Sequence, residues 1–111
     1  MKSQITMAEL GGSKSSHAEK IASFSGTHIT TDFEPTEFLI YCPIYNTSHR
    51  SSFYFNKATD PNNVYQNFDG TESTRSVSTG GIYPDSTGIT IENSLGQYFT
   101  GKLVYVVAGK E

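Results

Sequence analysis

The chain has 111 residues, of which 35% are hydrophobic and 17% charged, and its formal net charge is −3. This length fits one domain with a single core, and the scattered lysines and arginines do not form the basic stripe that nucleic-acid binding requires. No apolar run approaches the roughly 20 residues that span a bilayer, and a single cysteine, Cys42, excludes an internal disulfide and a cysteine-based zinc site. We therefore expect a soluble domain, made in a cytoplasm, with no nucleic-acid or membrane partner.

The composition favours strands over helices. Seven tyrosines and seven phenylalanines supply most of the bulky core material, and aromatic, Thr and Ser residues suit a pleated, half-buried surface. We predict an all-β fold, an antiparallel β-sandwich that is jelly-roll-like.

Residues 1–20 are small and polar, with a linker-like Gly/Ser run at 11–16. We expect an N-terminal arm or linker over 1–20 and a β-sandwich domain over 21–111. Residues 16–21 can form one capped helical turn or an extended lead-in, and the sequence leaves both open.

The first strands follow from alternation. Residues 27–33 place Ile29, Thr31 and Phe33 inward, and a turn at 34–36 leads into a strand over 37–44. This second strand and the strand over 101–108 are apolar on both faces, which is typical of strands buried on both sides. In the strand over 37–44, one face is expected to carry Phe38, Ile40, Cys42 and Ile44.

A neighbouring subunit is the simplest cover for the second face of these two strands. We therefore predict a homo-oligomer, most plausibly a trimer, whose interface contains Leu39, Tyr41, Tyr45, Leu103 and Tyr105.

The middle of the chain contains weaker strand patterns. An aromatic strand is expected over 51–56, with Phe53 and Phe55 on the same face, and a turn is expected at 60–63. Further strands are expected over 64–68 and over 73–82, the latter at a sheet edge. Turn dipeptides Gly80-Gly81 and Pro84-Asp85 then precede a hairpin strand with Ile89 and Ile91 on one face, and a last strand over 98–108.

The residue pattern contains no strong catalytic, metal or nucleotide motif. The three histidines have no metal-ligand spacing, and four carboxylates in predicted loops, Asp60, Asp69, Glu72 and Asp85, could at most act as the paired acid and base of a glycosidase. We expect no enzyme activity, no cofactor and no metal.

A set of aromatic, amide and charged residues is predicted to lie in loops, where stacking and bidentate hydrogen bonds could hold a sugar. The candidate ligand-binding residues are Tyr54, Asn62, Asn63, Tyr65, Gln66, Asn67, Asp69, Arg75, Tyr83 and Asp85.

Four segments of the chain form a recognisable series: GTHITTDFEP at 26–35, FLIY at 38–41, GITIEN at 88–93 and YVVA at 105–108. Together they resemble a module that recurs in tail and tail-fibre proteins of bacteriophages. The resemblance implies a β-sandwich head, often homotrimeric, in a virion, that meets host-surface glycans or caps a tail or baseplate. The His-x-His iron-binding pattern of some long fibres is absent from the sequence.

From the resemblance we expect a virion structural protein, of the tail-fibre or baseplate type, whose arm attaches it to other virion proteins and whose head binds a host-surface glycan. Two alternatives remain open: a purely structural assembly or capsid decoration protein, and a small glycan-directed hydrolase.

Overall fold

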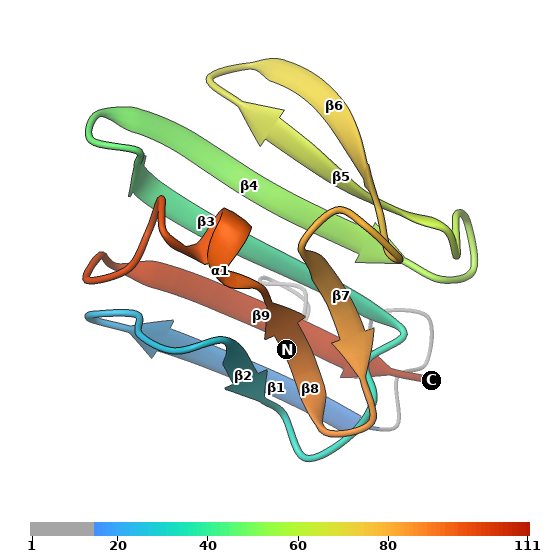
Figure 1. Cartoon of the computed structure of the whole chain (residues 1–111). Coiled ribbons are helices and arrows are strands. Elements are labelled where there is room, and N and C mark those ends of the chain that lie inside the picture. Colours follow the sequence, from blue (N-terminus) through green and yellow to red (C-terminus); the bar gives the residue numbers. More distant parts are fainter. Residues whose placement is uncertain (1–14) are drawn as a thin grey trace, which may run out of the picture.

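The computed structural model describes residues 15–111 and contains two antiparallel sheets packed face to face (Figure 1). In spatial order, the six-stranded sheet consists of β1 (Ser15–Ile21), β9 (Val104–Lys110), β3 (Glu37–Tyr45), β4 (His49–Asn56), β5 (Asn63–Phe68) and β6 (Thr71–Ser76). The three-stranded sheet consists of β2 (His28–Thr30), β8 (Gly88–Ile91) and β7 (Ile82–Asp85). The predicted all-β antiparallel sandwich is confirmed.

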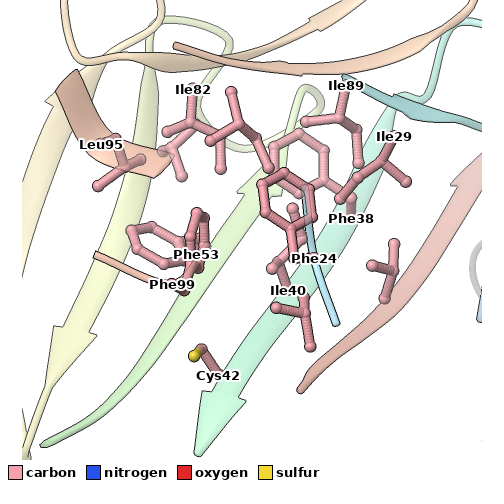
Figure 2. Packing of buried hydrophobic residues seen from close by; sticks show 14 of the residues in the cluster. Phe24, Ile29, Phe38, Ile40, Cys42, Phe53, Ile82, Ile89, Leu95 and Phe99 are labelled. Atoms are coloured by element: carbon pink, nitrogen blue, oxygen red, sulfur yellow. The ribbon is translucent and has the colours of Figure 1, made fainter. Parts of the chain in front are cut away.

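The core fills the space between the sheets (Figure 2). Phe53 and Ile40 from the large sheet and Ile89 from the small sheet are all fully buried, as period-two alternation predicts for the inner face of each strand. Cys42 is buried with them, and burial raises the pKa of its thiol. The expectation that Cys42 lies on a buried face of its strand is confirmed.

Strand β1 corrects the predicted extent of the N-terminal arm. It pairs along its length with β9, from Ser15 opposite Lys110 to Ile21 opposite Val104, so the last six residues assigned to the arm form an edge strand of the large sheet. The helical turn considered for residues 16–21 is wrong, because these residues are extended. The rest of the arm, residues 1–14, lies outside the described residues.

A β-bulge near the end of β3 reverses two expected side-chain positions. The β3–β4 register shifts between Cys42 and Tyr45, where Pro43 has no N–H to donate to a ladder. The bulge adds one residue to β3, so the side chains after it point to the opposite face of the sheet from the one that alternation predicts. Tyr45 is therefore 4% exposed and Ile44 is 52% exposed. The predictions that Ile44 faces the core and that Tyr45 belongs to a subunit interface are therefore wrong.

The C-terminal hairpin is confirmed, but its turn lies later than predicted. Pro84 and Asp85 belong to β7, and β8 starts at Gly88, after two turn residues. Gly88 has a φ of +155°, and a Cβ there would lie 2.0 Å from the carbonyl oxygen of Ile29. Only glycine therefore permits the close approach of β2 and β8.

The final strand begins later than the sequence predicts. Helix α1 (Asn93–Gly96) and a series of turns occupy the interval before β9, and they bury Leu95 and Phe99 against the core. A single turn of helix is too short to show a 3.6-residue period, which is why the pattern did not reveal it.

The bulge generates a stability prediction. We expect Tyr45→Ala to lower the free energy of unfolding by about 3 kcal/mol, because it empties a packed aromatic site. We expect Ile44→Ala, at the neighbouring position, to change it by less than about 0.5 kcal/mol, because its side chain is exposed. Urea unfolding of both variants checks this. The reverse ranking would contradict the bulge.

Candidate functional site

The outer face of the six-stranded sheet carries large side chains in a continuous row. Leu39 of β3 lies opposite Val107 of β9 on one side and Tyr54 of β4 on the other, and Tyr54 lies opposite Tyr65 of β5. Residues directly opposite in antiparallel strands bring their side chains into contact range. The register therefore builds a stripe across four strands, aliphatic at one end and aromatic at the other.

A second row runs beside the first. Tyr105 of β9 faces Tyr41 of β3, which faces Ser52 of β4, which faces Asn67 of β5. The rings of Tyr41 and Tyr105 stack with their centroids 6.3 Å apart. The two rows together divide the outer face into an aliphatic half over β9 and β3 and a polar half over β4 and β5.

Nothing in residues 15–111 covers the aliphatic half: Leu39 is 43% and Tyr105 41% exposed. Of the predicted interface residues, Leu39, Tyr41 and Tyr105 lie together on this face. Leu103 is half-buried and precedes β9, and Tyr45 is in the core. The structure therefore brings three of the five together on a free surface, and their role as a subunit interface stays a prediction.

The polar half contains a hollow of about 480 Å³ between β4, β5 and the start of β6. Its tyrosines are held by hydrogen bonds. The Tyr65 hydroxyl donates to Asp60 Oδ2 at 2.6 Å, and the Asn63 amide donates to the same oxygen at 3.2 Å. The hydrogen bond from Tyr65, followed by that from the Asn62 backbone N–H, lowers the pKa of Asp60, so this carboxylate is ionised at neutral pH. The hollow is lined by Ser52, Tyr54, Thr59, Asp60, Tyr65, Asn67 and Glu72.

A second hollow of about 290 Å³ adjoins the first and is formed by Tyr41, Arg50, Ser51, Ser52, Asn67, Asp69 and Gly70. Asp69 sits in the β5–β6 turn with a φ of +50°, and accepts a hydrogen bond from the Arg50 backbone N–H at 2.8 Å. The His49 Nδ1 atom lies 2.5 Å from the other carboxylate oxygen. These two contacts, the backbone one first, lower the pKa of Asp69.

The structure separates the predicted ligand-binding set. Tyr54, Tyr65, Asn67 and Asp69 line the two hollows. Asn62 and Asn63 do not line them, but both donate to Asp60 at the border. The remaining four residues lie elsewhere: Gln66, Arg75, Tyr83 and Asp85.

Gln66 and Arg75 form a structural network on the inner face of the large sheet. Gln66 is 5% exposed, its amide nitrogen donates to Ser51 Oγ at 3.0 Å, and its amide oxygen accepts from Arg75 Nε at 2.7 Å. Arg75 also donates to the Gly80 carbonyl oxygen at 2.9 Å. Their positions on β5 and β6 correct the expectation of loop residues, because each side chain faces inward from its strand and makes these hydrogen bonds within the protein.

Tyr83 and Asp85 belong to the opposite sheet, where Asp85 joins all three strands. Partial burial raises the pKa of Asp85, but hydrogen bonds outweigh it and lower the pKa to about 2. Its carboxylate accepts from Thr90 Oγ1 at 2.5 Å and from the Thr87 backbone N–H at 2.9 Å, and it lies 3.1 Å from His28 Nε2. The Thr87 hydroxyl approaches the same His28 nitrogen, and the other ring nitrogen, Nδ1, lies 3.1 Å from the Thr30 hydroxyl. Both ring nitrogens of His28 therefore have partners within the three-stranded sheet.

Five of the lining residues were not candidates in the sequence analysis: Arg50, Ser51, Ser52, Thr59 and Gly70. Asp60 and Glu72 entered it only as hydrolytic carboxylates. Alternation along β4 contains the missing signal, because Arg50, Ser52 and Tyr54 must share a face if Phe53 is inside. What the sequence lacks is the register that sets this face beside β5.

Among residues 15–111, no group of three or more His, Cys, Asp or Glu side chains is arranged to hold a metal ion. In the same part of the chain, no helix is long and apolar enough to cross a membrane. The chain matches no family model, no curated protein and no solved structure.

The carboxylate of Asp85 generates a pH prediction. Its folded pKa of about 2 lies below the ordinary value of 3.8, so its contribution to stability, about 2 kcal/mol, is complete above pH 5 and is lost as the pH falls toward 2. We expect Asp85→Asn to remove this contribution, and chemical unfolding at pH 7 and pH 3 measures it. An equal loss of stability at both pH values would contradict the shifted pKa.

Proposed function

We propose that this protein is a non-catalytic binding domain of a bacteriophage or prophage particle, and that it contacts a host-surface glycan through the outer face of its six-stranded sheet. The observation that carries the proposal is the pair of adjoining hollows on that face, the larger of which is lined by Tyr54 and Tyr65. Flat aromatic faces beside amide and carboxylate groups suit the apolar ring faces and hydroxyl groups of sugars. The assignment to a virion rests on the resemblance to tail and tail-fibre modules.

The aliphatic half of the same face supports self-assembly, and we include in the proposal that the domain is a homo-oligomer, a trimer, in the virion. Leu39, Tyr105 and Val107 form a contiguous apolar surface, and surfaces of this kind are typical of protein interfaces. On its own this observation favours the second candidate function, a structural part that binds only other virion proteins.

A glycan-directed hydrolase fits the hollows less well than a binding domain. A glycosidase needs a general acid whose pKa is raised so that it holds a proton near neutrality. The pKa values of Asp60 and Asp69 are both lowered, which suits carboxylates that accept hydrogen bonds and not one that donates a proton.

Adhesion to host cells, measured together with the oligomeric state, tests the proposal. We expect Tyr54→Ala to weaken cell adhesion at least tenfold without changing the molar mass, because the ring contributes contact area to the ligand. We expect Leu39→Asp to lower the molar mass measured by light scattering, because it inserts a charge into the aliphatic half.

The control is Tyr98→Ala, which removes a tyrosine of similar exposure from the segment after α1, and all variants are compared at matched thermal stability. If the wild type does not adhere to any host strain but assembles with virion proteins, the structural candidate replaces the glycan-binding proposal.

A further inference from the structure

We propose that the two hollows form one trough that binds an extended, uncharged oligosaccharide and rejects acidic glycans; this inference rests on the proposed function. Ser52 and Asn67 line both hollows, and they face each other in the β4–β5 ladder. The hollows therefore meet over this pair and continue in opposite directions along the strands. From Tyr65 to Asp69 the trough extends roughly 13 Å at about 3.3 Å per residue, which is longer than a single sugar ring.

The floor of the trough is ordered before any ligand arrives. The Tyr65 hydroxyl is held by Asp60, and the Tyr54 hydroxyl accepts a hydrogen bond from the Asn56 amide at 3.2 Å. Both rings are therefore oriented by the fold, while the Tyr54 side chain remains 42% exposed. Stacking a sugar on rings that are already fixed costs little further side-chain entropy.

The charge of the trough selects against anions. Its lining contains three acidic residues, Asp60, Asp69 and Glu72, and one basic residue, Arg50. Asp60 and Asp69 stay ionised because hydrogen bonds to their charged forms lower their pKa values. A uronic acid or phosphate group would meet like charge, which is an effective way to exclude a ligand.

The same groups are suited to an uncharged sugar. Carboxylate oxygens accept hydrogen bonds from sugar hydroxyl groups, and such charge-assisted bonds are stronger than neutral ones. Arg50 at the other end of the trough and the Asn67 amide in its middle can donate to ring and hydroxyl oxygens. The trough thus combines stacking surfaces in the larger hollow, which Tyr54 and Tyr65 line, with hydrogen-bonding groups along its whole length.

Nuclear magnetic resonance titration of the full 15N-labelled chain tests this inference. The neutral probes are chitotetraose, cellotetraose and maltotetraose, and the acidic probe is tetragalacturonate. We expect at least one neutral probe to shift the amide signals of Ser52, Tyr65 and Asn67, and tetragalacturonate to leave them unchanged. Tyr65→Ala should weaken the binding of that neutral probe at least tenfold, whereas Tyr98→Ala should leave it within twofold.

Charge selection is tested with Glu72→Gln, a variant of similar shape. Because the substitution removes a charged hydrogen-bond acceptor, we expect it to weaken the binding of the neutral probe and yet to permit detectable binding of tetragalacturonate. Tighter binding of tetragalacturonate than of every neutral probe by the wild type would overturn the inference. So would signal shifts confined to the opposite sheet.

The two proposals fail in different ways. Host-cell adhesion without trough shifts from any neutral probe would refute the uncharged-oligosaccharide inference and leave the binding function standing. Trough shifts from a virion protein instead of a sugar would refute both and support a structural role.

Discussion

The strand register of the six-stranded sheet is the constraint on which the rest of the structure depends. Alternation means that burying Ile40, Phe53 and Val64 on the inner face obliges their neighbours Leu39, Tyr54 and Tyr65 to share the outer face. A slip of one residue would exchange the two sets and expose the phenylalanine and aliphatic residues of the core. The packing of the core therefore also determines the tyrosine stripe.

Each of the two sheets also contains a network of polar side chains that connects its strands. Gln66 and Arg75 connect β4, β5 and β6 on the inner face, and Asp85 connects the three strands of the small sheet. A buried polar group costs free energy unless it is paired, and the groups in these networks are paired. Their side chains stabilise the scaffold, and among residues 15–111 nothing covers Leu39, Tyr54 or Tyr105 on the outer face of the large sheet.

The sequence predicts the elements well and the candidate site only in part. Alternation and turn residues reveal β3, β4, β5 and the β7–β8 hairpin, because each obeys a local rule. The bulge at Pro43, the single helical turn α1 and the strand β1 depend on partners distant in the chain, and β1 is so polar that only its pairing with β9 defines it.

The prediction of the candidate site was only partly correct, because it used local residue chemistry, which is sufficient for single strands but not for a surface built from several strands. Tyr65 and Asn67 were identified as recognition residues from their chemistry, but so were Gln66 and Asp85, whose hydrogen bonds stabilise the fold. Residue type alone does not distinguish a side chain that faces solvent from one that faces the core. The β4–β5 pairing makes that distinction, because it sets Ser52 beside Asn67 and Tyr54 beside Tyr65.

The most direct test of this account is a set of nuclear Overhauser contacts from the Tyr54 ring in solution. The account predicts contacts from this ring to the Leu39 methyl groups and to the Tyr65 ring, because cross-strand neighbours bring their side chains within about 5 Å. Contacts from the Tyr54 ring to the methyl groups of Ile40 or Val64 would place it on the inner face. That result would contradict the register, and with it the stripe, the trough and the function proposed for them.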